Sequence, residues 1–77
     1  MKINWNEYLT TNRDVLGGKI HIKNTRIGVD IVLERLSVGD TIDQIIESYP
    51  HLSKQQILAC IEYALQSVRN ENIYEFA

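Results

Sequence analysis

The chain contains a single cysteine, Cys60, and a single proline, Pro50. One cysteine forms no internal disulfide, so a disulfide framework is excluded and a reducing compartment is expected. No apolar run approaches the roughly 18 residues that a membrane-spanning helix needs. The N-terminus also lacks the apolar segment of a signal peptide. These absences predict a cytoplasmic protein that has no contact with a membrane.

Positive charge is scarce as well, with 8 Lys and Arg against 10 Asp and Glu, for a net charge of -2. Such a balance argues against a strong non-specific nucleic-acid binder, which is usually basic. The charge is uneven, because residues 1–39 carry a net +2 and residues 40–77 a net -4. We expect any polyanion to contact the N-terminal half, and a basic partner surface to be attracted to the C-terminal half.

The length of 77 residues predicts one domain. We divide it into an arm with a β-element (1–28), a three-helix unit (29–69) and a tail (70–77). A domain this small hides only about 60% of its unfolded surface. We therefore predict a homodimer, in contact through the N-terminal strand and through apolar residues left over on the third helix.

A turn followed by a short strand is predicted near the N-terminus. Gly17 and Gly18 form the turn, since glycine adopts positive φ without strain. Ile20 and Ile22 then alternate with His21 and Lys23, which predicts a half-buried strand with His21 on its polar face. Asn24 ends the strand, in keeping with its tolerance of left-handed backbone.

Three helices are predicted, over residues 29–38, 41–49 and 53–69. Gly39 is placed to end the first. Thr41 with Gln44, and Ser53 with Gln56, form capping boxes at the starts of the second and third. The apolar face of the third helix is expected to comprise Ile57, Ile61, Ala64, Leu65 and Val68. The short connection between the second and third helices is typical of a helix-turn-helix, so the fold class is mainly α with a short N-terminal β-element.

No recognisable set of catalytic residues is present, and we expect a protein that is not an enzyme. Lys19 follows two glycines but precedes Ile20 instead of Ser or Thr, so a plain turn is favoured over a phosphate-binding loop. His21, His51 and Cys60 match no standard zinc spacing. We expect neither a metal nor a cofactor.

Two groups of residues are candidates for DNA contact. The start of the third helix supplies groups suited to phosphates and base edges, namely Ser53, Lys54, Gln55 and Gln56. The alternative is a solvated helix start with good caps. The second group is the basic cluster Lys19, Lys23 and Arg26, in which the two lysines point the same way on a strand. Its alternative is an ion pair that joins Arg26 to Asp30 or Glu34.

Four segments resemble a small prokaryotic family known as domain of unknown function 433. They read LGGK (16–19), IKNTRI (22–27), SVGDTI (37–42) and YPHLS (49–53), and the similarity covers roughly residues 14–68. The chain departs from the family pattern at Ile20, where the family usually has Pro, at Asn24, where it has Gly, and at Gly28, where it often has Pro. The resemblance implies a trihelical, homeodomain-like fold. It also implies a VapB-type antitoxin, encoded beside a PIN-like nuclease toxin.

The resulting hypothesis is an antitoxin that binds and neutralises a PIN-like nuclease and also binds its own operator DNA. The apolar tail residues Ile73, Tyr74 and Phe76, flanked by Glu71 and Glu75, are expected to cover a basic groove on the toxin. A tail that folds back onto its own domain or dimer is the alternative. Two other functions stay open, a stand-alone DNA-binding regulator and a protein-interaction adaptor that binds no DNA.

Overall fold

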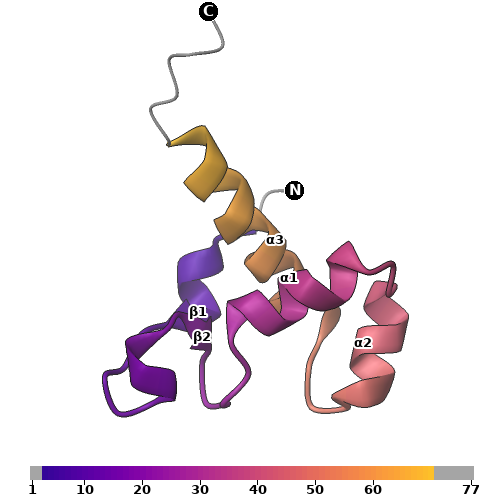
Figure 1. The fold of residues 1–77 in the computed structure, drawn as a ribbon, viewed down its shortest axis with the longest axis horizontal. Helices are drawn as coiled ribbons and strands as arrows, with labels where there is room; N and C mark the ends of the chain where they lie inside the picture. The colour runs from indigo at the N-terminus through magenta and orange to yellow at the C-terminus, as the bar shows by residue number, and fades with distance from the viewer. Residues whose placement is uncertain (1–2, 71–77) are drawn as a thin grey trace, which may run out of the picture.

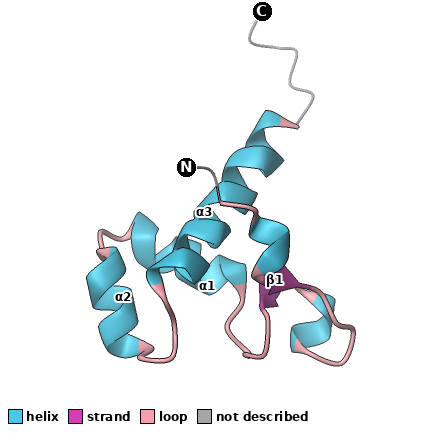
Figure 2. Cartoon of the chain, turned by 180° about the vertical axis from the view of Figure 1, so that it is seen from behind, coloured by secondary structure: helices cyan, strands magenta, loops and turns pink. Residues whose placement is uncertain are grey.

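The computed structural model describes residues 3–70. Its helices are α1 (Val29–Ser37), α2 (Ile42–Ser48) and α3 (Lys54–Arg69). Two short strands, β1 (Leu9–Thr10) and β2 (His21–Ile22), and two 3-10 turns, η1 (Trp5–Glu7) and η2 (Leu16–Gly18), precede them. The N-terminal segment and α2 lie at opposite ends of the molecule with α1 between them (Figures 1 and 2). The predicted mainly helical fold with an N-terminal β-element is confirmed.

The β-element is an antiparallel pair within one chain. Leu9 lies opposite Ile22 and Thr10 opposite His21. Leu16, Gly17 and Gly18 all have positive φ, so the backbone turns sharply just before β2. Strand β2 therefore has its partner, β1, within the same chain. Pairing with a second copy across a dimer is not needed to form the β-element.

The expected position of His21 on the polar face of the strand is wrong. The side chain is only 3% exposed, and Ile22 beside it is fully buried. An alternating pattern predicts one exposed face only where a strand is long and flat. Here β2 has two residues, and His21 forms a bridge with Gly28, so the chain on both sides of the strand covers the ring.

The core lies where the β-element, α1 and the first half of α3 meet. Its largest fully buried side chains are Ile22, Val29, Val32, Ile45, Ile57 and Cys60. Each helix supplies at least one of them, because apolar residues recur at the helical period and place a continuous stripe against the others. The three helices therefore pack on one shared apolar core.

Both predicted capping boxes are present. The Ser53 hydroxyl oxygen accepts a hydrogen bond from the Gln56 backbone N–H (3.2 Å), and the Gln56 side chain accepts one from the Ser53 N–H (2.7 Å). Thr41 and Gln44 repeat this arrangement at α2. Gly39, at φ +100°, lies just past the end of α1 as predicted. Each box satisfies N–H groups that a helix start otherwise leaves without partners.

We expect Ser53→Ala to lower the free energy of unfolding by about 1 kcal/mol, because it removes the N-cap acceptor of the longest helix. In a domain of this size that corresponds to a melting temperature lower by about 4–8 °C. Thermal unfolding followed by circular dichroism measures the shift. Ser67→Ala, at an exposed position inside α3, is the matched control, and an equal shift in both variants would contradict a capping role.

Arg35 connects the end of α1 to α2. Its guanidinium donates to Asp40 and to the Ser48 hydroxyl (3.1 Å), and it lies 5.9 Å from the centre of the Tyr49 ring. The hydrogen bond to Asp40 raises the pKa of Arg35 above its usual range. This set of polar contacts fixes the angle between α1 and α2 outside the apolar core.

The start of the chain packs on α3 through an aromatic side chain. The Trp5 indole N–H donates to the Gln66 side-chain oxygen (3.0 Å), and the Trp5 and Tyr63 rings meet edge to face at 5.0 Å. These contacts hold η1 along α3. Within residues 3–70, no helix is long and apolar enough to cross a membrane.

Candidate functional site

Of the four residues predicted to contact DNA at the start of α3, two form the helix cap and two do not. Ser53 and Gln56 engage each other in the capping box, so their side-chain oxygens are already used. Lys54 and Gln55 are exposed beside them and take no part in the box. Of the four predicted residues, only these two have side chains that reach outward without breaking a cap.

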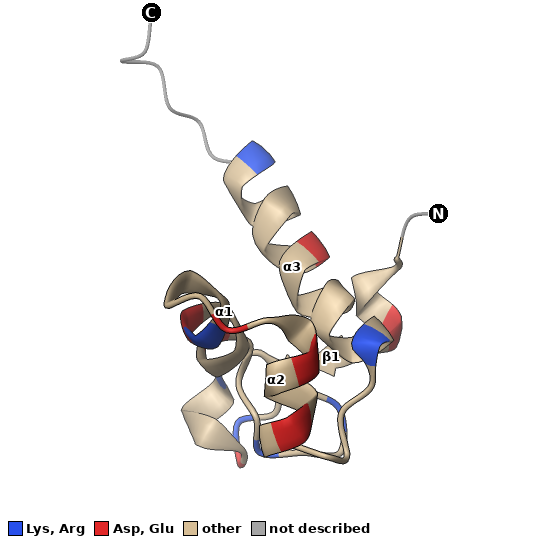
Figure 3. Ribbon diagram, turned by 90° about the vertical axis from the view of Figure 1, so that its right-hand side faces the viewer, with Lys and Arg blue, Asp and Glu red and all other residues tan. Residues whose placement is uncertain are grey.

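Exposed acidic residues lie on the helix that precedes this start. Asp43 and Glu47 are one turn apart on α2 and both are exposed. The acidic positions of α2 face the same side of the molecule (Figure 3). Phosphate contacts supply much of the affinity for DNA. With one cation, Lys54, at the start of α3 and two exposed carboxylates on α2, the charge balance of these two helices does not favour strong binding of a phosphate backbone.

The predicted basic cluster is split by the fold. Lys19 forms an ion pair with Asp30 at the start of α1 (Nζ to Oδ2, 3.5 Å), so it is Lys19, and not Arg26, that joins the β-element to α1. Lys23 and Arg26 are exposed, and within residues 3–70 no ion pair engages either of them. Lys23 and Arg26 are therefore the two cations of the predicted cluster that are left without an ion pair among the described residues.

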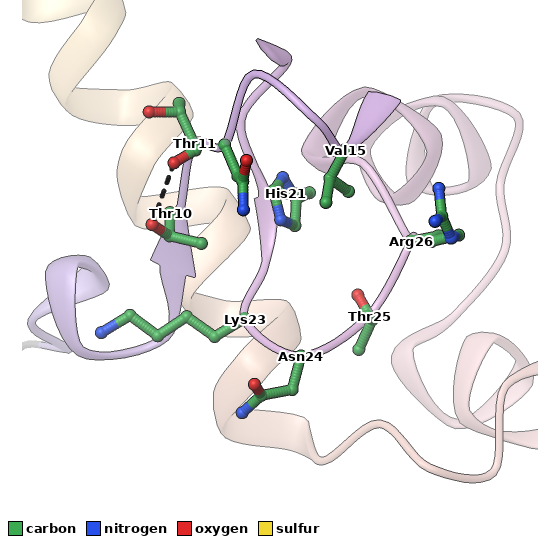
Figure 4. A pocket seen from close by; sticks show the side chains of 9 residues that line it. Thr10, Thr11, Val15, His21, Lys23, Asn24, Thr25 and Arg26 are labelled. Carbon is green, nitrogen blue, oxygen red and sulfur yellow. Dashed lines mark hydrogen bonds between the residues drawn. The ribbon is translucent and has the colours of Figure 1, made fainter. Parts of the chain in front are cut away.

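Lys23 and Arg26 lie at the edge of an open pocket of about 610 Å³. Its other walls come from the segment after β1 and from the turn after β2, and the lining residues are Thr10, Thr11, Asn12, Val15, His21, Lys23, Asn24, Thr25 and Arg26. The His21 ring lies in the middle of this group (Figure 4). Sequence reasoning missed the pocket, because its walls are separate segments that carry no shared local signal.

His21 and Thr25 hold the pocket in shape. His21 Nδ1 lies 2.9 Å from the Lys19 carbonyl oxygen. The Thr25 hydroxyl donates to the Ile22 carbonyl (2.8 Å) and accepts from the Ile27 N–H (3.0 Å). Asn24 occupies the left-handed region at φ +63°, as its position in the turn predicts. The turn after β2 is thus closed by side chain to backbone hydrogen bonds.

The apolar face of α3 differs from the predicted one. Ile57, Ala59 and Cys60 are buried, while Ile61, Leu65 and Val68 are 37%, 39% and 64% exposed. The last three follow each other at spacings of four and three residues, so they form one stripe along the helix. We call Ile61, Leu65 and Val68 the α3 stripe. It lies on the second half of α3, whose C-terminal end projects from the rest of the molecule (Figure 1).

The predicted toxin contacts Ile73, Tyr74 and Phe76 lie outside the described residues. Within residues 3–70, no group of three or more His, Cys, Asp or Glu is arranged to hold a metal ion.

Cys60 is buried in the core, and burial raises the pKa of its thiol to about 12. We expect no reaction with Ellman's reagent at pH 8 in the native protein and full reaction after unfolding in guanidinium, because the thiolate is the nucleophile. Between about pH 9 and 12 the native state keeps the thiol proton, whereas the unfolded chain, in which the thiol pKa is the ordinary 9.0, has released it. Stability from this group is present below about pH 9 and is lost as the pH rises towards 12. Rapid labelling of the native protein would contradict the buried placement.

One family model matches the chain, over residues 9–64, and its description is "Protein of unknown function (DUF433)". The chain belongs to the DUF433 family. No curated protein and no solved structure matches it. All nine residues that line the pocket of this DUF433 protein lie inside the matched range, whereas Leu65 and Val68 of the α3 stripe lie beyond it. The pocket is therefore built from the part of the chain that the family shares.

Proposed function

We propose that this DUF433 protein is an antitoxin of a type II toxin–antitoxin system that binds and neutralises a PIN-like nuclease. The observation that carries the proposal is the α3 stripe. Three large apolar side chains lie exposed along one side of the second half of α3, whose end projects from the domain (Figure 1). Contiguous exposed apolar surface on a small domain marks a contact with another protein. The resemblance to the DUF433 family, which implies an antitoxin encoded beside a PIN-like nuclease, supplies the class of partner.

Charge supports a nuclease as the occupant of this surface. The C-terminal half carries a net -4, and the exposed acidic residues of α2 belong to it. A groove that binds nucleic acid is basic, because it neutralises phosphates. An apolar stripe within the acidic half of the chain is complementary to the rim of such a groove. We infer that binding here blocks access of the nucleic acid.

Co-expression with the product of the adjacent gene tests the proposal. We expect a complex that survives size-exclusion chromatography, and nuclease activity that falls in proportion to the added DUF433 protein. Light scattering on the DUF433 protein alone gives its oligomeric state. A nuclease that stays fully active with equimolar DUF433 protein would overturn the proposal. So would a stripe occupied by a second copy of the chain within the purified complex.

Operator binding is the second candidate function, and the exposed Lys54 and Gln55 at the start of α3 favour it. In this reading α2 and α3, joined by residues 49–53, act as a homeodomain-like helix-turn-helix. We expect weak binding with strong salt dependence, since few cations are present. Fluorescence anisotropy with upstream DNA tests it, and Lys54→Ala should weaken all sequences equally while Gln55→Ala alters sequence preference. An affinity unchanged in both variants would exclude α3 as the reader.

A further inference from the structure

The pocket beside β2 has a polar wall that carries positive but no negative charge. Among its nine lining residues are Lys23, Arg26 and the His21 imidazole, and none is Asp or Glu. In a chain with more acidic than basic residues, a pocket that lacks carboxylates is a local reversal of the overall charge. Both cations are exposed and, in the described part of the chain, neither is paired. The surroundings favour an anion.

His21 gives the pocket a fixed polar group at its centre. The residue is 97% buried, with 3% exposure, yet it lines the pocket. Its Nδ1 faces the Lys19 carbonyl at 2.9 Å, and a carbonyl only accepts, so Nδ1 carries a proton. The other ring nitrogen of His21, Nε2, is left to form a hydrogen bond with a ligand. It accepts from a hydroxyl when the ring is neutral and donates to an oxyanion when the ring is protonated.

The other polar groups are placed to complement this nitrogen. Lys23 and Arg26 extend on opposite sides of the His21 ring (Figure 4). The Asn12 side-chain oxygen accepts from the Asp14 N–H (2.9 Å), which leaves its amide N–H groups as donors on the pocket wall. Residues from two stretches of the chain, 10–15 and 21–26, thus line one open space of about 610 Å³, with the two cations at its rim.

We propose that this pocket binds a phosphate group, with His21 Nε2 at its base and Lys23 and Arg26 at its mouth. Phosphate suits the site because it offers several acceptor oxygens and a hydroxyl in its singly protonated form, which matches either state of the imidazole. The phosphate comes either from a free mononucleotide or from a nucleic-acid strand. The site is separate from the α3 stripe, so it does not depend on the partner protein proposed above.

The test uses the full chain labelled with 15N, whose two histidine rings are resolved by long-range proton–nitrogen spectra. His51, exposed in the turn between α2 and α3, is the internal control. Adenosine 5′-monophosphate is titrated against a sodium chloride series of equal ionic strength. We expect a saturable shift of the His21 Nε2 resonance with the nucleotide only, and no matching shift at His51.

Two sets of variants make the result specific. His21→Asn retains a donor for the Lys19 carbonyl and removes Nε2, so it should weaken nucleotide binding at least tenfold at an unchanged melting temperature. Lys23→Ala combined with Arg26→Ala changes exposed residues only and should weaken binding similarly. It keeps the proposal testable if His21→Asn fails to fold. Lys54→Ala, a cation outside the pocket, should change the affinity less than twofold.

A short single-stranded oligothymidylate without terminal phosphates distinguishes the two sources. Binding of the nucleotide alone assigns the pocket to a free phosphomonoester, and binding of both at similar affinity assigns it to the backbone of a nucleic-acid strand. The proposal is overturned if neither probe gives a saturable shift at concentrations up to tens of millimolar. It is overturned equally if the His21 and cation variants bind as the unchanged chain does.

Discussion

Replacing Ile57 by alanine is expected to lower the free energy of unfolding by about 3–4 kcal/mol, the range for truncating a buried aliphatic side chain. Ile57 is fully buried in the first turn of α3, next to Leu52, which is itself only 4% exposed. The substitution removes methyl and methylene groups from the place where α3 joins the core. At 77 residues the total stability is about 4–12 kcal/mol, so the substitution removes at least about a quarter of it.

Chemical denaturation of Ile57→Ala measures this loss, and Val68→Ala is the matched control. Val68 lies on the same helix but is 64% exposed, so its truncation should change the free energy of unfolding by less than about 0.5 kcal/mol. Ile57→Val should fall between them, at about 0.5–1.5 kcal/mol. Equal effects of the alanine substitutions at 57 and 68 would mean that α3 does not pack through the face described.

Replacing Leu65 by glutamate is expected to weaken binding of the proposed nuclease about 100-fold, equivalent to about 2.7 kcal/mol. Leu65 is the middle residue of the α3 stripe, and a glutamate there places an unpaired charge within a dry interface. The domain itself should keep its stability, because the position is 39% exposed in the free protein. Isothermal titration with the purified nuclease measures the affinity.

Ser67→Glu is the control for the added charge. It is exposed on the same helix, two residues along, and therefore points to nearly the opposite side. This variant should bind the nuclease with an affinity close to that of the unchanged chain. If Leu65→Glu and Ser67→Glu bind alike, the stripe is not the contact surface, and the nuclease is bound elsewhere on the chain.

The helices and their ends could be predicted from the sequence because their signals are local. Ser53 and Gln56 are three residues apart, and the hydrogen bonds between them depend on no other part of the chain. The same holds for Gly39 and Asn24, whose positive φ values follow from their own steric limits. Capping and turn formation are decided within one or two turns of backbone.

The faces of β2 and α3 could not be predicted, because burial depends on what lies opposite. The alternation of apolar and polar residues around His21 gives no information about Gly28, which forms a β-bridge with His21 in the folded chain. The period of Ile57, Ile61, Leu65 and Val68 predicts an amphipathic helix, but not how far the rest of the domain extends along it. Within residues 3–70 no other element covers this side of the second half of α3, and so three of the five residues of the predicted face are exposed.

The candidate site shows the same limit. Lys23 and Arg26 were identified from their charge, whereas the pocket also needs Asn12 and Val15 from a loop that precedes β2. Lys19 was grouped with them by sequence distance, and its ion pair with Asp30 removes it. Charge and proximity along the chain identified two of the residues, but only the folded turn places them around His21.

The hydrogen bond between Trp5 and Gln66 joins residues 61 positions apart. On the ribosome η1 therefore cannot make these contacts until almost all of α3 has emerged. The first and last described elements then stabilise each other, so η1 packs only once α3 is present. The chain's only tryptophan lies at this junction. Its fluorescence therefore reports closure of the whole domain, and not the order of any one helix.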